Sequence, residues 1–531
     1  MKVVTIKNIC QYDKKEHKLN QGDNNLLILF FNKLIINFKG MTEYILSNEE
    51  MAQADQITIT SGISSIQLME NAGKAVFKNL PTKNINRVLI LAGPGNNGGD
   101  GFVVARLLIE IGTQVDVYFF SSKKISKDCE INKNRIDDHI IIDEITDFSQ
   151  YAYVVDALFG TGFTRRIPKV LENLFFKIKK NKIPVYAVDI PSGINGNSSK
   201  IDGDCLQCSK TITFFNKKKC HYLYPGKRFC GEVIVEDIGI SKEIFKTVNP
   251  KIKNNNPDLW IKEFPFPSSA DHKYSRGLLV INSGPIYKTG AARLAGRSAM
   301  RVGAGAVKLI CDEEAAKVLE PQISVELISV VKEKNEIQKI FKDKKVSSVL
   351  VGPGNGINDE TKTRTLMALA FVDHVVIDAD AITCFEDNPK ELFIDTYSHT
   401  ILTPHEGEFR RLFGEKIASI EDKVVRTVEA SKIAGSIIVL KGSDTVIADP
   451  EGNVVINSSE APYLATAGSG DVLAGIIASL AGKKKMNAFN AACAGTWIHS
   501  KLGELIGPGL IAEDLIDNIP LVIKKLYNND Y

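Results

Sequence analysis

The chain has 531 residues, which exceeds one ordinary domain, so we expect two or three domains. Its hydrophobic fraction of 44% and charged fraction of 24% are typical of globular proteins, and the net charge of +3 gives no indication of nucleic-acid binding. Among the nine cysteines, Cys205 and Cys208 form a Cys-x-x-Cys pair without a second pair at zinc spacing, which favours reduced thiols over structural zinc.

No apolar run in the sequence approaches the length that spans a bilayer. The nearest candidate, residues 26–38, is short and is interrupted by Asn32 and Lys33. It follows a segment of mixed charge and precedes no small-residue cleavage site, so it matches a signal peptide poorly. We therefore expect a cytoplasmic protein without membrane contact.

Residues 1–40 differ from the rest of the chain because they mix charges with an apolar patch and show little helix or strand period. Shortly after Met41, Ser47 and Glu50 have the spacing of a capping box, which predicts the start of a helix. We expect the functional protein to begin near Met41, with residues 1–40 a disordered extension or an artefact of the start site. An appended helix that packs on the domain is the alternative.

A glycine-rich run at residues 93–102 reads Gly-Pro-Gly-Asn-Asn-Gly-Gly-Asp-Gly-Phe, between a predicted strand at 87–92 and helical character from Val103. Its five glycines predict a turn that brings backbone close to a ligand, and the following helix N-terminus offers N–H groups to an anion. The spacing is not that of a P-loop and fits the dinucleotide pattern only loosely. A glycine-rich turn with a purely structural role is the alternative.

Two later predicted strands, at 151–156 and 184–189, end in Asp156 and Asp189, and a glycine-containing loop follows each. The alternation of strands and helices predicts a mostly parallel sheet, in which ligands bind outside the carboxyl ends of the strands. Together with the glycine-rich run, three polar loops are expected to converge on one pocket.

Residues 241–257 are rich in Lys, Asn and Pro and are predicted to form a linker. A second alternating region follows, with a predicted helix at 289–301 that is rich in small residues. The expected strands of this region lie at 278–282, 347–351, 374–378 and 436–440.

The most specific motif is Ala-Thr-Ala-Gly-Ser-Gly-Asp at residues 465–471, which opens a predicted helix. Glycines at a helix N-terminus form an anion site, and Asp471 beside them can take a proton from a hydroxyl that attacks phosphate. Together with residues 441–445 as a nucleotide-facing turn, this motif predicts a phosphoryl-transfer site that has no P-loop. His405 lacks the second histidine of a zinc metalloprotease, and a capping or core histidine is the alternative to a ligand contact.

From about Met41 onward, the chain resembles the family of bifunctional NAD(P)H-hydrate repair enzymes. The first-domain motifs that carry the resemblance lie at 71–73, 93–102, 155–162 and 188–193. The second-domain motifs lie at 290–292, 301–307, 352–354, 403–408, 441–442 and 467–475. The resemblance implies an α/β fold, with a Rossmann-like three-layer αβα domain at 41–240, the linker at 241–257 and a ribokinase-like domain at 258–531.

This family joins an isomerase and a lyase in one chain. By resemblance, the first domain is an NAD(P)H-hydrate epimerase that interconverts the R and S epimers at C6 of the hydrated nicotinamide. The second is an ADP- or ATP-dependent dehydratase that phosphorylates the C6 hydroxyl of the S epimer, after which loss of phosphate restores NADH or NADPH. The partners implied are small molecules, namely the hydrated dinucleotides and an adenine nucleotide, and we expect a homo-oligomer.

The resemblance implies an epimerase site with Asp189 as the catalytic acid–base residue and with a potassium ion. The implied substrate contacts are Asn96, Asn97, Gly98, Gly99, Asp100, Gly160, Thr161, Gly162, Phe163, Thr164, Arg165, Arg166 and Asp189. The implied potassium ligands are Asn97, Asp156 and Ser192, which supply the hard oxygen atoms that suit an alkali cation.

For the dehydratase site, the resemblance implies Asp471 as the catalytic residue and magnesium with the nucleotide. The implied substrate contacts are Ala291, Gly354, His405 and Asp471. The implied nucleotide contacts are Lys441, Gly442, Ser443, Asp444, Thr445 and Gly470.

Two other functions compete with this interpretation. The second domain alone is compatible with a ribokinase-like small-molecule kinase, and the first domain with a non-catalytic binding scaffold, because fold does not fix function. Asn97, Asp156, Asp189 and Ser192 argue against a scaffold, which does not need that set.

Overall fold

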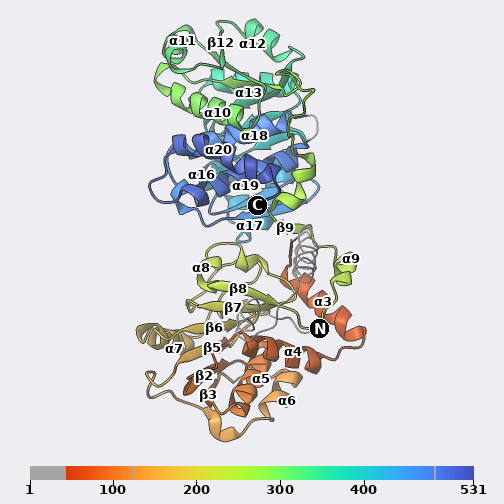
Figure 1. Cartoon of the computed structure of the whole chain (residues 1–531), viewed down its shortest axis with the longest axis vertical. Coiled ribbons are helices and arrows are strands. Elements are labelled where there is room, and N and C mark those ends of the chain that lie inside the picture. The colour runs from red at the N-terminus through yellow and green to blue at the C-terminus, as the bar shows by residue number, and fades with distance from the viewer. Residues whose placement is uncertain (1–42, 122–123, 484–485) are drawn as a thin grey trace, which may run out of the picture. The chain divides into compact units, whose positions relative to one another are not determined.

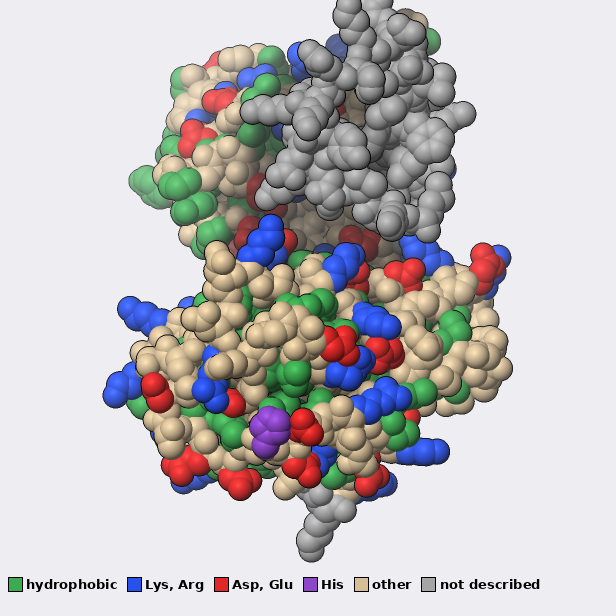
Figure 2. Space-filling model, turned by 60° about the horizontal axis from the view of Figure 1, so that its bottom comes forward, with side chains coloured by type: hydrophobic (Ala, Val, Ile, Leu, Met, Phe, Trp, Pro, Cys, Tyr) green, Lys and Arg blue, Asp and Glu red, His purple; other side chains and the backbone are tan. Residues whose placement is uncertain are grey.

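The computed structural model describes residues 43–121, 124–483 and 486–531 (Figure 1). The predicted extension at residues 1–40 lies outside this part of the chain. Nowhere in the described residues does a helix combine the length and the apolar character that crossing a bilayer requires. Figure 2 shows acidic and basic side chains interspersed on the face in view, in keeping with the balanced charge of the sequence.

The first sheet has seven strands in the order β4-β3-β2-β5-β6-β7-β8, and all neighbouring strands are parallel. The strands are β2 (Arg87–Ala92), β3 (Gln114–Phe119), β4 (Ile141–Ile142), β5 (Tyr153–Ala157), β6 (Val185–Val188), β7 (Lys210–Phe214) and β8 (Glu232–Glu236). The helices of this region are α3 (Asn48–Thr60), α4 (Ser65–Lys78), α5 (Asn96–Glu110), α6 (Lys127–Lys133), α7 (Lys169–Lys180), α8 (Lys227–Cys230) and α9 (Phe245–Val248).

Alternate residues of β2 enter two different cores, because successive side chains of a strand point to opposite faces. Val88 and Ile90 pack with residues of α4 and α5 in one cluster. Leu89 and Leu91 pack with residues of α7 in another. Helices therefore cover both faces of the sheet, which is the predicted three-layer αβα arrangement.

The second sheet has eleven strands in the order β1-β9-β18-β17-β16-β15-β14-β13-β10-β11-β12. Its strands are β1 (Tyr44–Ile45), β9 (Ile252–Asn254), β10 (Leu278–Asn282), β11 (Ala306–Cys311), β12 (Leu327–Val330), β13 (Val346–Val351), β14 (Val375–Ile377), β15 (Thr400–Leu402), β16 (Ile437–Leu440), β17 (Asp444–Ala448) and β18 (Val454–Ser458). The run from β12 to β16 is parallel, whereas β16, β17 and β18 are antiparallel. Within the predicted linker, β9 pairs with β1 and β18.

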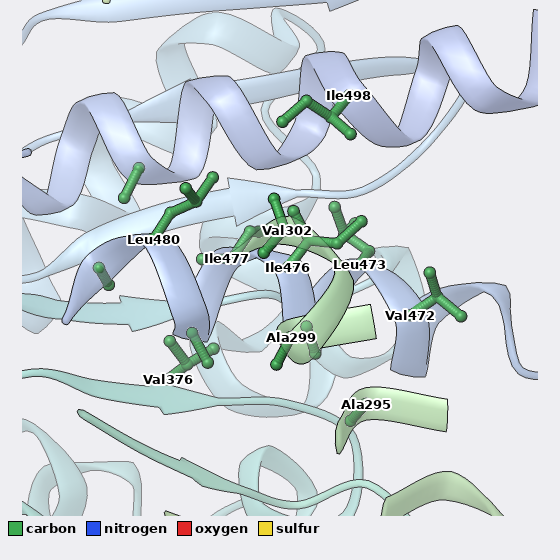
Figure 3. Packing of buried hydrophobic residues seen from close by; sticks show 14 of the residues in the cluster. Ala295, Ala299, Val302, Val376, Val472, Leu473, Ile476, Ile477, Leu480 and Ile498 are labelled. Atoms are coloured by element: carbon green, nitrogen blue, oxygen red, sulfur yellow. The ribbon is translucent and has the colours of Figure 1, made fainter. Parts of the chain in front are cut away.

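Helices also cover both faces of the second sheet, with a large buried cluster on each side. These helices are α10 (Thr289–Val302), α11 (Glu313–Leu319), α12 (Lys334–Phe341), α13 (Asp359–Phe371), α14 (Asp380–Thr383), α15 (Pro389–Phe393), α16 (Glu406–Ala418), α17 (Lys423–Ala434), α18 (Ser469–Ala481), α19 (Ala488–Ile506) and α20 (Ala512–Tyr527). Figure 3 shows the cluster in which Ala295 and Ala299 of α10 lie next to Val472, Leu473 and Ile476 of α18.

One local prediction is wrong. The run at 93–102 is not a turn up to Phe102, because α5 already begins at Asn96 with Gly95 as its N-cap. Gly98 and Gly101 are therefore helical residues, and a larger side chain at either position would clash with neighbouring atoms. A Cβ at Gly98 would lie 1.8 Å from the Gly93 carbonyl oxygen, and one at Gly101 would lie 2.8 Å from the Ala157 Cβ. Glycine here permits close approach of the helix to the preceding turn and to β5.

Candidate active sites

A cavity of about 550 Å³ lies at the carboxyl ends of β2, β5 and β6. The three polar loops that the sequence analysis expected to converge all contribute to it. The lining residues from these loops are Pro94, Gly95, Asn96, Asn97, Asp100, Leu158, Phe159, Gly160, Thr161, Gly162, Phe163, Arg165 and Asp189. Further lining residues come from α3 and α4 and from the segment after β7, and they include Asp55 and Lys218.

Asp189 is held in this cavity by a short network of polar contacts. Its backbone has a φ of 64°, in the left-handed region that only a supported turn maintains. Its Oδ1 accepts hydrogen bonds from Lys218 Nζ at 2.5 Å and from Thr213 Oγ1 at 2.8 Å. The His221 ring nitrogen Nδ1 accepts from the Lys218 amide at 3.0 Å, so Nε2 is free to donate to the Asp189 carbonyl at 3.1 Å.

The carboxyl groups of the cavity differ in charge state. Burial alone would raise the pKa of Asp189, but the adjacent Lys218 ammonium and the Thr213 hydroxyl outweigh it, so this pKa is lowered. Burial raises the pKa of Asp55 to about 6, against the attraction of Lys218 and with the repulsion of Asp189. Burial, reinforced by Asp189 and Asp55, raises the pKa of Asp100 well above its ordinary range. The cavity thus pairs an ionised carboxylate with carboxyl groups that retain protons more readily.

The three residues implied as potassium ligands lie beside this cavity. Asp156 is fully buried, and its two oxygens accept from the Ser192 hydroxyl at 2.6 Å and the Ser192 amide at 2.8 Å. The Asn97 amide nitrogen donates to the Val188 carbonyl at 3.0 Å, which leaves its oxygen available near Gly160. No basic side chain forms an ion pair with Asp156 within the described ranges. A buried carboxylate without a cationic partner and with oxygen donors nearby fits a monovalent cation.

The remaining residues of the implied epimerase set have other positions. Gly98 and Gly99 are inside α5, where a Cβ at Gly99 would lie 2.4 Å from the Met69 sulfur. Arg165 lines the cavity, whereas Arg166 pairs with Glu172 at 3.0 Å. Thr164 is exposed and does not line the cavity.

The second site gathers around the N-terminus of α18. Gly468 caps this helix with a φ of 83°, and Asp471 lies in its first turn. Lys441 follows β16, and its Nζ donates to Asp378 Oδ1 at 2.7 Å. Thr403 Oγ1 donates to the same carboxylate oxygen at 2.8 Å. A Cβ at Gly470 would lie 3.9 Å from Lys441 Nζ, so the lysine faces the start of α18.

The charged groups of this second site shift one another's pKa values. Burial raises the pKa of Asp471 to about 6, with a further rise from Asp378 and Asp380 and a lowering by Lys441. Burial would lower the pKa of Lys441, but the carboxylates of Asp378 and Glu408 more than compensate, so its pKa is raised and it stays charged. The site therefore combines a fixed positive charge with a carboxyl group that titrates close to neutrality.

His405 is the N-cap of α16. A capping role was the predicted alternative to a ligand contact for this residue. Its Nδ1 accepts from the Gly407 amide at 2.9 Å, and its own amide donates to Glu408 at 2.9 Å. The imidazole is about half exposed, with 54% of its side-chain surface accessible, and its Nε2 lies 3.2 Å from Glu408 Oε1. Glu408 lies close enough to influence Lys441, which connects His405 to the second site.

Ala291 and Gly354 are neighbours, because a Cβ at Gly354 would lie 3.2 Å from the Ala291 Cβ. The residues of the predicted nucleotide turn, 441–445, differ in exposure and in their partners. Gly442 and Thr445 hydrogen-bond each other at 3.2 Å, and Ser443 is exposed. The Asp444 carboxylate, in contrast, is buried and pairs with Lys423 at 2.8 Å.

Several polar residues of the two sites were not expected from the sequence. Asp55 carried a usable signal, since it shares a helix face with Met51 and Ile59 at spacings of four. Asp378 carried one as well, because it ends a predicted strand as Asp156 and Asp189 do. Lys218 and His499 had no such signal. The buried His499 ring bonds the Ser469 hydroxyl at 2.9 Å and so supports the first turn of α18.

The comparisons with known proteins agree with this division into two sites. A family described as YjeF-related protein N-terminus matches residues 65–220, and a family described as NAD(P)H-hydrate dehydratase matches residues 279–520. A bifunctional NAD(P)H-hydrate repair enzyme of Dictyoglomus turgidum is 31% identical over 517 residues, which cover 91% of this chain and 98% of that relative. The chain belongs to the family of bifunctional NAD(P)H-hydrate repair enzymes.

Other bifunctional NAD(P)H-hydrate repair enzymes match over a similar span. The one from Moorella thermoacetica is 31% identical and covers 91% of this chain and 97% of its own length. The one from Escherichia coli is 29% identical and covers 87% and 90% respectively. Among solved structures, the ADP/ATP-dependent NAD(P)H-hydrate dehydratase of Bacillus subtilis, co-crystallised with ATP and Mg²⁺, is 26% identical with a TM-score of 0.43 and covers 50% of this chain and 95% of its own. The sequence relatives confirm the family expected from the sequence, and the parallel strands covered by helices on both faces confirm the α/β fold class.

Proposed function

We propose that this repair enzyme carries out its two reactions at the two sites described above, the epimerisation at the Asp189 cavity and the dehydration at the Asp471 cluster. The observation that carries the proposal is the presence of two separate sites with ionisable groups, one at each sheet, in a chain whose repair-enzyme relatives match it almost end to end. We assign residues 41–240 to the epimerase domain, 241–257 to the connection and 258–531 to the dehydratase domain.

In the epimerase site, we assign to Asp189 a proton transfer with the C6 hydroxyl of the hydrated nicotinamide. The Lys218 ammonium keeps this carboxylate ionised, so Asp189 can act as a base at neutral pH. The cavity of about 550 Å³ has the size of a small-molecule site, and the loop from Leu158 to Phe163 together with Asn96 and Asn97 supplies polar contacts to the dinucleotide.

We propose that Asn97, Asp156 and Ser192 hold a potassium ion beside the substrate. The buried carboxyl group of Asp156, which has no cationic partner among the described residues, supports this assignment. When bound, the ion supplies a positive charge that balances Asp156 and fixes the loops after β5 and β6. Asp156 and Ser192 already join these two loops through two hydrogen bonds, so the ligand set is preorganised.

In the dehydratase site, we assign to Asp471 the removal of the C6 hydroxyl proton as that oxygen attacks the terminal phosphate of the nucleotide. The backbone N–H groups at the start of α18 and the Lys441 ammonium offer positive charge to the phosphate oxygens. Phosphate is a better leaving group than hydroxide, so its elimination restores the nicotinamide double bond. Ala291, Gly354 and His405 are assigned to the substrate, and Gly442, Ser443, Thr445 and Gly470 to the nucleotide.

Magnesium is assigned to the nucleotide rather than to a protein cage. No group of three or more His, Cys, Asp and Glu side chains that could hold a metal ion is found among the described residues. Mg²⁺ usually binds through substrate phosphates together with one or two carboxylates, and Asp380, which lies close enough to Asp471 to raise its pKa, would be such a carboxylate here. When bound, the ion neutralises charge on the phosphates.

The experiment that tests the proposal follows the near-ultraviolet absorbance of reduced nicotinamide in a mixture of the R and S hydrates with magnesium and either ADP or ATP. Complete recovery of NADH from both epimers is expected, and the faster nucleotide identifies the donor. Recovery that stops at the S fraction would contradict the epimerase assignment, provided that spontaneous epimerisation is slower than the assay. No recovery with either nucleotide would contradict the dehydratase assignment.

We further propose that the enzyme acts in the cytoplasm as a homo-oligomer on small-molecule substrates. Light scattering of the purified chain tests the oligomeric state, and cell fractionation tests the location. A monomer or a membrane-bound pool would contradict these assignments.

A further inference from the structure

We propose that Asp55 is a second catalytic residue of the epimerase site, which exchanges a proton with the substrate ring from helix α3 while Asp189 acts from the end of β6. This inference rests on the proposed epimerase function and extends it. A single acid–base group does not complete the reaction, whereas the cavity holds Asp55 in addition to Asp189.

The position of Asp55 is that of a ligand-facing residue. Met51, Asp55 and Ile59 are four residues apart in α3, so they share one face of the helix, and all three line the cavity. The two acidic residues in the first turn of α3 have structural partners, since Glu50 closes the capping box and Glu49 accepts from Asn197. In contrast, the side chain of Asp55 forms no hydrogen bond or ion pair with any other residue of the described ranges.

The electrostatics separate the roles of Asp55 and Asp189. Lys218 contacts Asp189 directly and holds its carboxylate ionised. Burial and the negative charge of Asp189 bring the pKa of Asp55 to about 6, so it can both give and take a proton near neutral pH. Charged groups that face the cavity from the surrounding elements are Lys218 after β7, Asp189 after β6, Asp100 on α5, Asp128 on α6 and Arg165 in the loop after β5.

The chemistry of the substrate requires both an acid and a base. Carbon C6 of the hydrate carries a hydroxyl group and is bonded to the ring nitrogen N1. When Asp189 removes the hydroxyl proton, the O–H electrons form a carbonyl at C6, the C6–N1 bond breaks, and its electron pair goes to N1. Asp55 then supplies the proton that N1 takes up. Rotation of the aldehyde and closure on its other face, with both proton transfers reversed, gives the second epimer and restores both carboxyl groups.

The test measures interconversion of purified R and S hydrates by the full-length enzyme across about pH 5 to pH 8, with the uncatalysed rate subtracted. Asp55→Asn is expected to lower the catalysed rate by about 10²- to 10³-fold and Asp55→Glu to restore part of it. In the unaltered enzyme the rate falls as the pH rises above about 6, because Asp55 loses the proton that it must donate, and this decline is absent in Asp55→Asn. Asp138→Asn, which alters a carboxylate that is 92% exposed, is the matched control.

Dehydration of the S hydrate in the same preparations checks that each variant is folded, since that reaction belongs to the other site. An Asp55→Asn enzyme with normal epimerisation, or one that keeps the decline above pH 6, would overturn the role of Asp55 while leaving the proposed function intact. An unaltered enzyme that dehydrates the S hydrate but does not accelerate epimerisation would overturn both.

Discussion

Asp189 and Asp471 are partly buried carboxyl groups near a lysine, yet their pKa values move in opposite directions. Lys218 contacts Asp189 at 2.5 Å, and this contact overcomes the cost of burial. Lys441 instead donates its hydrogen bond to Asp378, so its effect on Asp471 is indirect, and burial dominates. The distance from each carboxyl group to its lysine therefore decides that Asp189 stays ionised at neutral pH, whereas Asp471 titrates near neutrality.

The pH dependence of dehydration follows from Asp471. As a base, Asp471 must be ionised, and its pKa of about 6 predicts that kcat falls about tenfold per pH unit below that value and is level above it. Asp471→Asn is expected to lower kcat by at least about 10²-fold at every pH and to abolish the acid limb. The measurement is the initial rate on the pure S hydrate with saturating nucleotide. An acid limb that persists in Asp471→Asn would assign it to another group.

Asp156 gives a prediction for potassium. Replacing potassium by lithium is expected to slow epimerisation, because a smaller ion does not fill a site built from the loops after β5 and β6. Asp156→Asn removes the charge and is expected to weaken the apparent potassium affinity by at least about tenfold. The epimerase rate is titrated with potassium chloride at constant ionic strength, with Asp138→Asn as the control. A rate that is equal in both salts would contradict a potassium site.

Glycines inside α5 and α18 are required by close contacts between elements. In α18, a Cβ at Gly475 would lie 2.2 Å from the Ala295 carbonyl oxygen and 2.3 Å from the Ser298 hydroxyl, both on α10. The Ser298 hydroxyl also bonds the Val472 carbonyl of α18 at 3.1 Å, so the two helices are in direct contact over this surface (Figure 3). Because α18 presents Asp471 from its first turn, the packing of α18 on α10 positions the second site.

Gly475→Ala is therefore expected to destabilise the second domain by about 1–3 kcal/mol, since the added methyl group forces α10 and α18 apart. Gly290→Ala is the matched control in α10, because a Cβ there meets nothing within 4 Å. Heat inactivation of the dehydratase activity compares the two variants. Equal inactivation temperatures for Gly475→Ala and Gly290→Ala would contradict the requirement for close packing.

The two proposed sites belong to different sheets and share no residue, which predicts that they work independently. Asp189→Asn is expected to dehydrate only the S fraction of a mixture, and Asp471→Asn to epimerise without restoring NADH. Mixing the two variants in one reaction is expected to recover all of the NADH, because the released S hydrate reaches the intact dehydratase site by diffusion. Absorbance of reduced nicotinamide measures the recovery. A mixture that still stops at the S fraction would show that the sites must act within one chain.

Local patterns in the sequence determined the alternation of strands and helices, the capping box at Ser47 and the position of Asp156 and Asp189 at strand ends. These features depend on neighbouring residues, so the hydrophobic period and the spacing of polar residues are sufficient to predict them. The motif at 465–471 likewise predicted a helix N-terminus with an acidic residue, which the structure contains as Gly468 and Asp471.

Only the tertiary structure decided which lysine meets which carboxylate and where α5 begins. Lys218 and Asp189 are 29 residues apart, and Lys441 and Asp378 are 63 apart, so their meeting depends on the order β5-β6-β7 in one sheet and β14-β15-β16 in the other. Strand order is a property of the packed sheets, and a hydrophobic period does not encode it. Gly98 and Gly101 were likewise not predictable as helical residues. In the sequence, a glycine that permits a close long-range contact cannot be distinguished from a glycine that forms a turn.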